Sequence, residues 1–400
     1  MASGGTSVSE PAIQLRVFEL DFRNDSRWEE FVSSHPDALI YHHPDWLTAL
    51  EKEYGAKCLS LACEDENRRL HGVLPLLCTK GLPFRLGRNA TNSRLSSLPR
   101  TPVAGPLALD EHAVRELTRH AFQLATSHSG TQLEIKTQIA RLDSSVQGLS
   151  CLPWRSTYVE ELPTGVEGKP WVEFWERVRL PRNCGPCKGC KRLRFGNAKQ
   201  QHRVNWAVNK AIRLGLEVRE ASSEQDLEKW YALYLETMRH NAVPPRSYRF
   251  FASLWSSMHA KGELQLLLAE REIDSSKRMV AGSILLKYGQ TVFYAFTGCA
   301  PQDLCLHPHD LIQIESIRDA CKGGFRWYDF GEVPEHHEAL AQFKTKWGAK
   351  PKPLYRYYSP RFSDGPSNVG PSSASMLRKI WQHLPARATQ VLGDVIYRYL

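Results

Sequence analysis

Hydrophobic positions recur along the chain with two different periods, and together they predict an ordered series of helices and strands. In the N-terminal part, apolar residues at helical spacing predict helices beginning near Ser26 and Asp45, and a longer helix over Glu111–Thr126. Short apolar runs predict strands at residues 58–63, 73–78, 132–136 and 158–162. This succession predicts one α/β unit within residues 12–162.

A second unit of the same class is predicted in residues 163–360. The Pro- and Gly-containing stretch 163–170 favours turns and has little to bury, so it is the expected boundary. Helical spacing then predicts helices near 171–178, 200–214, 222–238 and 248–260. A strand meander follows over 264–269, 280–288 and 291–297. The elements predicted after it are a helix, a strand, a helix and a strand over 308–321, 325–330, 335–347 and 354–358.

Both ends of the chain lack the pattern of a packed unit. Residues 1–11 are small and polar and are expected to form a disordered tail. Residues 361–400 combine a Pro/Ser/Gly-rich linker with an amphipathic helix whose apolar positions are interleaved with Lys and Arg. Such a helix either lies on a membrane surface or folds back on its own domain, and the second arrangement is favoured here.

The composition fits a folded globular protein of two domains. The chain has 400 residues, of which 42% are hydrophobic and 10% aromatic. No apolar run approaches the ~20 residues needed to cross a bilayer, and the N-terminus lacks the basic start and apolar stretch of a secretory signal. The expected location is therefore cytoplasmic, with peripheral membrane contact through the C-terminal helix as an alternative. Ten scattered cysteines in such a location do not predict a disulfide framework.

Positive charge is concentrated in one segment. The formal net charge is +9, and residues 182–213 contain nine Lys or Arg residues, Arg203 among them, and no acidic residue. A local field of one sign attracts a polyanion such as tRNA, a nucleotide-sugar diphosphate or an anionic membrane. The alternative is a solvated basic loop without a partner.

Three cysteines of this basic segment have the two-residue spacing of metal knuckles, namely Cys184, Cys187 and Cys190. A closed zinc site needs a fourth ligand, for which His202 is the available histidine. Leu193 stands where a bacterial ferredoxin pattern has its further cysteine. These cysteines are therefore weak metal candidates or a redox-sensitive loop, and no metal requirement is predicted.

The most specific pattern lies near the end of the second unit. It consists of Trp327–Gly331, the run Phe343–Gly348 and the aromatic strand Tyr355–Tyr358. The order predicts a short strand ending in Asp-x-Gly, a helix with Lys344 in its last turn, a Trp-Gly stop and a closing strand. Because ligands of open α/β sheets bind beyond the carboxyl ends of strands, a cation here suits a developing oxyanion or a phosphate.

These motifs resemble the end of the FemAB-like N-acyltransferases of the GNAT superfamily. Weaker matches are Tyr294-x-Phe296-x-Gly298, His307-Pro308 and the N-terminal His43-Pro44-x-Trp46. The resemblance implies an α/β (α+β) fold of tandem GNAT-like domains, each a mixed, mostly antiparallel sheet flanked by helices. It also implies N-acyltransferase activity, with the reaction in the second domain, residues 163–360.

The resemblance assigns roles to individual residues. Lys344 matches the family lysine thought to steady the carbonyl of the acyl donor, and a surface lysine at a helix end is the alternative. Asp329 is expected either to accept a proton from the attacking amine or to cap the next helix turn, with Glu332 and Glu335 as other bases. The expected substrate-binding residues are Phe343, Tyr294, Phe296, His240, Trp347 and Arg203.

Two of these expectations rest on position along an element. Tyr294 and Phe296 alternate along one predicted strand, so they are expected to form one stripe, as part of the core or as an aromatic wall toward the acceptor. His240 lies in a His-x-x-x-Pro turn after a long helix. It is expected to line the acceptor groove or to be an ordinary loop histidine.

The donor is expected to be an acyl-CoA or an aminoacyl-tRNA. The Gly-rich loop that holds the CoA diphosphate in GNAT proteins has its counterpart at Cys299–Asp310, where no glycine follows Gly298. FemAB-like proteins share this loss, and several of them use aminoacyl-tRNA. The long helical arm of the Fem ligases, however, has no matching heptad pattern in this chain.

The acceptor is expected to be an amine on a nucleotide- or lipid-linked precursor of the cell envelope or of a polysaccharide. One alternative function is acyl-CoA-dependent acetylation of a small amine or amino sugar. Another is polyanion binding by a GNAT-like protein without catalysis. The patterns specify no oligomeric state.

Overall fold

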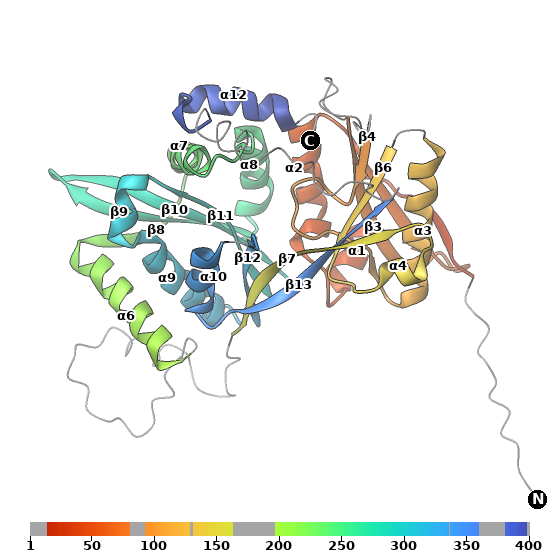
Figure 1. Cartoon of the computed structure of the whole chain (residues 1–400), viewed down its shortest axis with the longest axis horizontal. Coiled ribbons are helices and arrows are strands. Elements are labelled where there is room, and N and C mark those ends of the chain that lie inside the picture. Colours follow the sequence, from red (N-terminus) through yellow and green to blue (C-terminus); the bar gives the residue numbers. More distant parts are fainter. Residues whose placement is uncertain are drawn as a thin grey trace, which may run out of the picture.

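The computed structural model describes residues 14–80, 93–128, 131–162, 197–335, 337–359 and 381–397. The predicted boundary at 163–170, the predicted helix near 171–178 and the three cysteines of the basic segment lie outside these ranges. Within them, thirteen strands join in one sheet that runs through the molecule and carries helices on its faces (Figure 1).

The N-terminal half alternates helices and strands, as its hydrophobic pattern predicts. Pro44 begins the second helix with His43 as its cap, and Gly55 ends it at φ +65°, a left-handed conformation that favours glycine. Its elements are β1 (Arg16–Glu19), α1 (Arg27–Ser34), η1 (Ile40–His42), α2 (Pro44–Tyr54), β2 (Cys58–Glu64), β3 (Leu70–Lys80), β4 (Ser93–Ser96), β5 (Leu107–Ala108), α3 (Glu111–Ser127), β6 (Thr131–Thr137), α4 (Leu142–Ser145) and β7 (Ser150–Glu161).

The C-terminal half has two helices capped by serines before its strand meander. Ser223 accepts a hydrogen bond from the Asp226 N–H, and Ser247 does the same for the Phe250 N–H. The elements are α6 (Ala198–Arg213), β8 (Leu216–Glu220), α7 (Glu224–His240), α8 (Tyr248–Leu254), η2 (Trp255–His259), β9 (Leu264–Ile273), β10 (Ser276–Tyr288), β11 (Thr291–Cys299), η3 (Pro301–Leu306), α9 (Pro308–Lys322), β12 (Trp327–Val333), α10 (Glu338–Thr345), β13 (Lys350–Ser359) and α12 (Ala386–Tyr397).

The two halves have the same strand order and exchange their last strands. The order across the sheet is β1-β2-β3-β4-β6-β13-β7-β12-β11-β10-β9-β8. β13 pairs with β6 of the N-terminal half, β7 pairs with β12 of the C-terminal half, and β7 and β13 pair with each other at the centre. The two predicted sheets therefore form one continuous sheet (Figure 1), and each half depends on a strand of the other.

Aromatic side chains from both halves meet in one core. Trp46 of α2 packs edge-on against Phe250 of α8, with ring centroids 5.3 Å apart. Tyr41 of η1 contacts Phe293 of β11 at 5.5 Å. Because these residues are buried, the contact holds Tyr41 of the first half against the sheet of the second half.

A buried ion pair also joins the halves. Arg246, which precedes α8, pairs with Glu53 of α2, and both side chains are almost fully buried. Its guanidinium also donates to the Arg100 carbonyl at 2.7 Å, and the Ser247 N–H donates to the Glu53 carboxylate at 3.2 Å. Burial raises the pKa of Glu53, so this carboxylate depends on Arg246 for its compensation.

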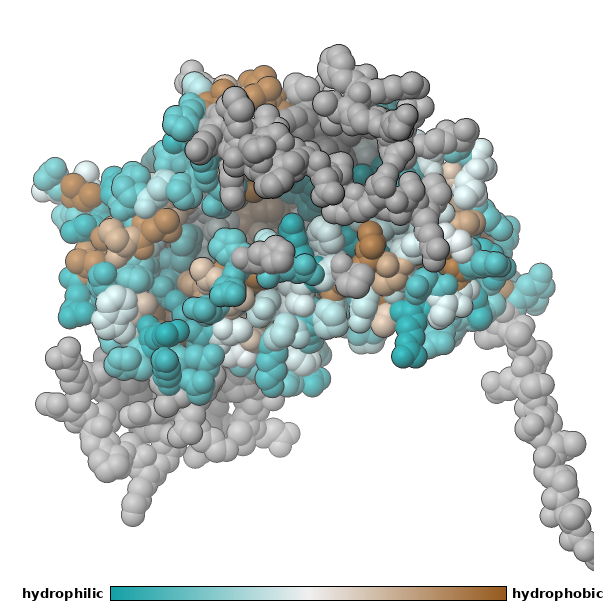
Figure 2. Space-filling model, viewed as in Figure 1, coloured by the Kyte–Doolittle hydropathy of each residue, from teal (hydrophilic) through white to brown (hydrophobic). Residues whose placement is uncertain are grey.

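The described part of the C-terminal tail folds back on the molecule. α12 packs against α7 and α2, and a Cβ on Gly393 would lie 2.9 Å from the Pro245 carbonyl oxygen. Val391 and Leu392 stay exposed, and apolar residues gather over α12 at the top of Figure 2. No helix within the described ranges is long and apolar enough to cross a membrane.

Candidate active site

The candidate site lies where β11 and β12 separate. These parallel strands pair only over Thr291–Phe293 and Trp327–Asp329. Beyond that point β11 remains paired with β10 as far as Cys299, while β12 stays with β7. Four successive β11 residues from Tyr294 to Thr297 are half-buried there, although Val292 and Phe293 are buried. The carboxyl end of β12 is thus the natural position for a ligand in this half.

Lys344 is held at this place by the backbone of β12. Its ammonium group donates to the carbonyls of Gly331, at 2.8 Å, and Glu332, at 2.9 Å. The side chain is buried, with 6% exposed, and burial lowers the pKa of Lys344 to about 8. An ammonium has three donors, so one N–H remains after these two bonds. The surface-lysine alternative is therefore wrong.

Asp329 lies on β12, two residues before Gly331, whose carbonyl binds Lys344. Its Oδ1 accepts hydrogen bonds from Thr157 Oγ1, at 2.6 Å, and from the Gly331 N–H, at 2.7 Å. Burial raises the pKa of Asp329, and these hydrogen bonds and the charge of Lys344 oppose the rise. The cap of α10 is His337, so the expectation that Asp329 caps the next helix is wrong.

Two further groups surround this pair. Glu332 lies 3.7 Å from Arg155 of β7 and is mostly buried, whereas Glu335 is exposed in the following turn. Tyr41 is buried, and burial raises its pKa, with a further contribution from the charges of Asp329 and Glu332. The site of the C-terminal half is therefore completed by residues of the N-terminal half.

The aromatic stripe predicted on β11 does not form. In the pairing with β10, Leu285 faces Tyr294 and Ile284 faces Phe296, so Ala295 is an extra residue in a β-bulge. The bulge turns the two rings to opposite faces of the sheet. Tyr294 hydrogen-bonds Ser283 and His309 on the α9 side, and Phe296 packs against the aromatic rings of α7 and α8. The aromatic-wall prediction is wrong because a bulge breaks the two-residue period.

A comparison with known families decides what this arrangement is. Residues 198–344 match the model of the acetyltransferase (GNAT) domain, and the match ends at Lys344 itself. The C-terminal half thus contains a GNAT-type domain over these residues. Its enzyme class is N-acyltransferase, as the resemblance implied. A comparison with curated protein sequences found no match.

Solved structures share this GNAT fold over most of the chain. The crystal structure of FemX superposes with a TM-score of 0.57 at 14% identity, covering 86% of this chain and 96% of FemX. The C-terminal domain (DUF2156) of a candidate lysylphosphatidylglycerol synthetase from Agrobacterium fabrum gives a TM-score of 0.50 at 11% identity, covering 89% and 94%. At these identities the likeness concerns the fold.

The loop that would hold a CoA diphosphate in this GNAT domain carries buried acids. Asp310, in the first turn of α9, is paired with Lys346 and lies 3.5 Å from His307. Asp303 in η3 is paired with Arg278 at 2.7 Å. Both carboxylates are neutralised by these cations, so the loop and helix start offer little net positive charge to a diphosphate.

Gly298, which precedes that loop, has a packing role. A Cβ at this position would lie 2.6 Å from the Tyr234 backbone nitrogen of α7. Only glycine allows α7 to approach β11 so closely. The glycine of the pattern Tyr294-x-Phe296-x-Gly298 is therefore explained by the packing of the strand against α7.

Among the described residues, the N-terminal half shows no comparable opening between its parallel strands β4 and β6. After β4 the chain stays on the edge of β6: the Ser97 N–H donates to the Glu134 carbonyl and the Ala104 N–H to the Lys136 carbonyl. The ammonium of Lys136 is buried and donates to the Leu98 carbonyl at 2.8 Å. The segment after β4 fills the place that stays open in the GNAT domain of the C-terminal half.

The other predicted substrate residues lie in several surroundings. Phe343 is half-buried beneath the ammonium of Lys346, whereas Trp347 is fully buried in the core. His240 is exposed at the end of α7, where its carbonyl accepts from Gln382 at 2.6 Å. Arg203 is exposed on α6, which packs against α9. Phe343 precedes Lys344 on α10, and its ring lies against Lys346.

One group in the described part of the chain could hold a metal ion, formed by His43, Asp45 and Glu263. Lys261 already pairs with the Asp45 carboxylate at 2.8 Å, and His43 Nδ1 accepts the Asp45 N–H. An ammonium therefore supplies the positive charge at this place. The weak metal candidates Cys184, Cys187 and Cys190 lie outside the described residues.

Sequence reasoning missed the residues that reach the site from other elements. Thr157 and Arg155 come from the exchanged strand β7, and Tyr41 comes from η1. Tyr41 precedes the motif His43-Pro44-x-Trp46 by two residues, so that weak motif was the available signal. Nothing in the sequence indicates that β7 crosses to β12.

Proposed function

We propose that this chain transfers an acyl or aminoacyl group to an amine, with the reaction at the end of β12. The observation that carries the proposal is the buried ammonium of Lys344, which two backbone carbonyls hold beside Asp329. A fixed cation in a buried site stabilises the negative charge that develops on a carbonyl oxygen under attack. The GNAT fold and the FemX-like architecture support this class of reaction.

The chemistry needs no covalent enzyme intermediate. A neutral amine attacks the carbonyl carbon of an ester or thioester donor, and the Lys344 ammonium faces the resulting oxyanion. Asp329 accepts the proton lost by the amine nitrogen and returns it to the departing oxygen or sulfur. The C–N bond forms, the C–O or C–S bond breaks, and the enzyme ends in its original protonation state. Burial raises the pKa of Asp329, which makes its carboxylate a stronger base than an exposed aspartate.

An aminoacyl-tRNA donor fits the site better than acyl-CoA. The loop before α9 lacks a glycine after Gly298, and the ion pairs of Asp303 and Asp310 leave little net positive charge there for a diphosphate. The adjoining helix α6 exposes Arg203, Trp206 and Arg213, a basic and aromatic surface that suits a nucleic acid backbone and its bases. The acceptor in this proposal is an amine on a nucleotide- or lipid-linked envelope or polysaccharide precursor.

The donor is tested by mass spectrometry of the products. The full chain is incubated with a pool of charged tRNA, or with a pool of acyl-CoA, and with a mixture of amino acids, polyamines and amino-sugar nucleotides. We expect amide products with charged tRNA, and no such products when the charged tRNA is treated with ribonuclease before the reaction. Products that form only with acyl-CoA would show that acyl-CoA is the donor instead. If neither donor gives a product, the alternative of polyanion binding without catalysis would be supported.

Replacing Asp329 by asparagine should slow transfer by about 10²- to 10⁴-fold, because the base is lost while the hydrogen-bond acceptor at this position remains. The measurement is the rate of amide formation at saturating donor, with thermal unfolding as a check on folding. Glu332→Gln is the matched control and should retain most activity. If Glu332→Gln is inactive and Asp329→Asn is active, Glu332 is the base and the role of Asp329 is refuted.

A further inference from the structure

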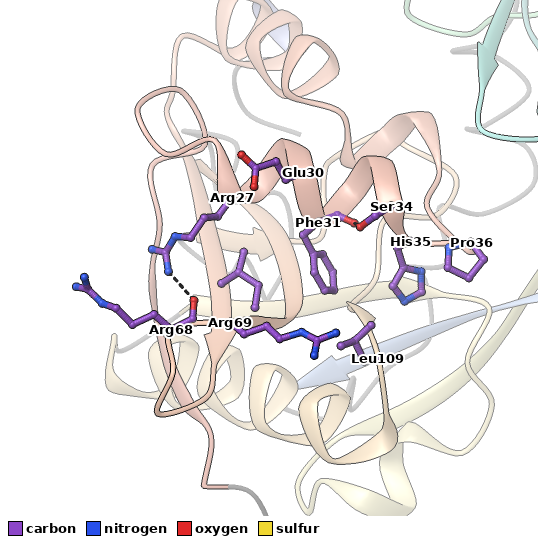
Figure 3. Close-up of a pocket in the computed structure, with 10 residues that line it drawn as sticks. Arg27, Glu30, Phe31, Ser34, His35, Pro36, Arg68, Arg69 and Leu109 are labelled. Atoms are coloured by element: carbon purple, nitrogen blue, oxygen red, sulfur yellow. Dashed lines mark hydrogen bonds between the residues drawn. The ribbon is translucent and has the colours of Figure 1, made fainter.

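A surface pocket on the N-terminal half lies apart from the elements that build the candidate active site. It has a volume of about 310 Å³ and lies between α1, the turn before β3 and the chain before α3. Figure 3 shows Arg69 extended along this pocket, with its guanidinium near Leu109 and the Phe31 ring above it. The volume is at the lower end of the range of small-ligand sites.

The floor of the pocket is apolar and fixed. Phe31 and Leu70 are buried, with 8% and 6% exposed, while Leu109 is 49% exposed at the rim. His35 contacts Phe31 at 5.6 Å, and its two ring nitrogens are both engaged: Nε2 donates to the Ala108 carbonyl and Nδ1 accepts the Asp37 N–H. The imidazole therefore adds a ring edge to the pocket and has no free ring nitrogen for a ligand.

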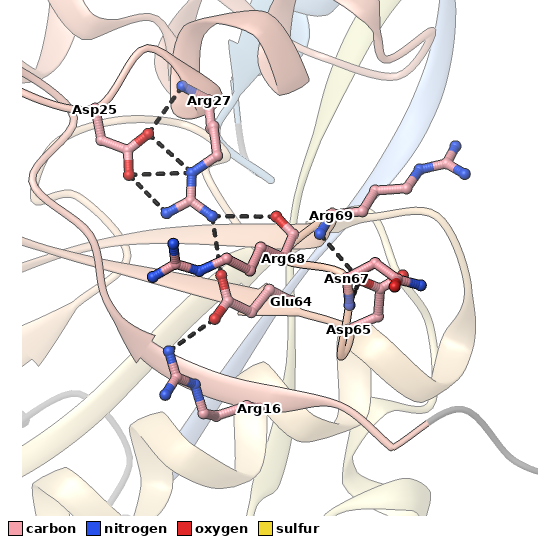
Figure 4. Close-up of polar contacts among 8 residues, drawn as sticks. All are labelled: Arg16, Asp25, Arg27, Glu64, Asp65, Asn67, Arg68 and Arg69. Carbon is pink, nitrogen blue, oxygen red and sulfur yellow. Dashed lines mark hydrogen bonds and ion pairs between the residues drawn. The ribbon is translucent and has the colours of Figure 1, made fainter.

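Of the nearby carboxylates, Glu30 lines the pocket and accepts a hydrogen bond from the Ser26 hydroxyl at 2.7 Å. Those of Asp25, Glu64 and Asp65 are engaged by other groups (Figure 4). Asp25 binds Arg27 through both oxygens, and Glu64 pairs with Arg27 at 2.9 Å and with Arg16 at 2.7 Å. Asp65 accepts the N–H groups of Asn67 and Arg69. Among the described residues, the guanidinium of Arg69 has no carboxylate partner. An unpaired cation therefore faces an apolar floor.

The turn that carries Arg69 is held in a strained form. The preceding residue, Arg68, has φ +63°, a left-handed conformation in which glycine or asparagine is usual. The turn is closed by hydrogen bonds between Asp65 and the backbone of residues 68 and 69, and Arg27 donates to the Arg68 carbonyl at 3.1 Å. The Asp25–Arg27–Glu64 network thus fixes the base of the Arg69 side chain, which is the preorganisation expected of a binding residue.

We propose that this pocket binds a small amphipathic anion, a carboxylate or phosphate monoester attached to an apolar or aromatic body. The planar guanidinium of Arg69 offers two parallel N–H donors to either head group, and the body packs on Phe31 and Leu109. The N-terminal half, whose own strand opening is filled, then serves as a recognition module. This inference does not rest on the proposed transfer reaction.

The test is the affinity of the full chain for phenyl phosphate and phenylacetate, measured by titration calorimetry. Inorganic phosphate and benzyl alcohol are the probes that carry only the head or only the body. We expect at least one amphipathic probe to bind about tenfold or more tightly than both partial probes, because charge and apolar contact add. Tighter binding of phenyl phosphate identifies the head group as phosphate, and tighter binding of phenylacetate identifies it as carboxylate.

Two variants locate the binding. Arg69→Gln should weaken the preferred probe by about tenfold or more, and Leu109→Ser should weaken the amphipathic probe but not inorganic phosphate. Arg249→Gln, which removes an exposed arginine of α8, is the matched control and should bind as the unaltered chain does. Absence of binding by every probe, or equal affinity of Arg69→Gln and Arg249→Gln, would overturn the proposal.

Discussion

Replacing Lys344 by methionine should reduce the rate of transfer by about 10²- to 10³-fold, the effect expected when one donor to an oxyanion is lost. Methionine keeps most of the apolar stem, so the core around α10 stays filled. The measurement is amide formation under single-turnover conditions. The loss should appear in the chemical step and not in donor affinity, because the ammonium acts on charge that develops during the reaction.

The control for this variant is another lysine of the same half. Lys322, at the end of α9, is exposed and has no described ion pair. Lys322→Met should transfer at the unaltered rate, and Lys344→Arg should retain part of the activity because it keeps a cation. Equal activity of Lys344→Met and Lys322→Met would remove Lys344 from the mechanism, whatever the fold.

Replacing Arg246 by methionine should lower the free energy of unfolding by about 3–5 kcal/mol, because Glu53 would be left charged and buried without its partner. The pair joins α2 to the segment before α8, so the loss falls on the contact between the halves. Thermal or denaturant unfolding, followed by circular dichroism, measures it. Arg249→Gln, on the surface of α8, should change stability little.

The pH dependence of that loss gives a second check. Burial raises the pKa of Glu53 above its usual value, so the folded state binds a proton that the unfolded state releases, and stability falls as pH rises through this window. Without Arg246 the pKa of Glu53 should rise further, so the stability deficit of Arg246→Met should shrink as the pH falls and Glu53 becomes protonated. The double variant Glu53→Gln, Arg246→Met should recover much of the loss. A deficit that stays constant with pH would contradict the buried-charge explanation.

The sequence predicted local features of the site well. The order strand, helix, Trp-Gly and strand near the C-terminus matches β12, α10 and β13, because each element has its own hydrophobic period and its own end signal. Lys344 and Asp329 lie together because a single strand–helix step carries both. A short-range motif of this kind fixes its own geometry.

Features that depend on pairing between distant strands could not be predicted. The bulge at Ala295 changes the register with β10 and separates Tyr294 from Phe296, although the alternation of residues is unbroken. The exchange of β7 and β13 brings Thr157 and Arg155 to the site, and the contact with Phe293 brings Tyr41. Hydrophobic periods determine which face a residue occupies but not which strand lies beside it.

The account depends on a protonated Lys344, and the pH dependence of transfer tests this most directly. Burial lowers the pKa of Lys344 to about 8, so the cation is present below that pH and is lost above it. The rate of the unaltered chain divided by that of Lys344→Arg cancels the titration of the acceptor amine. We predict that this ratio is constant below pH 8 and falls about tenfold per pH unit above it. A ratio that rises through pH 8 would show that neutral Lys344 acts as a base and would contradict the oxyanion role.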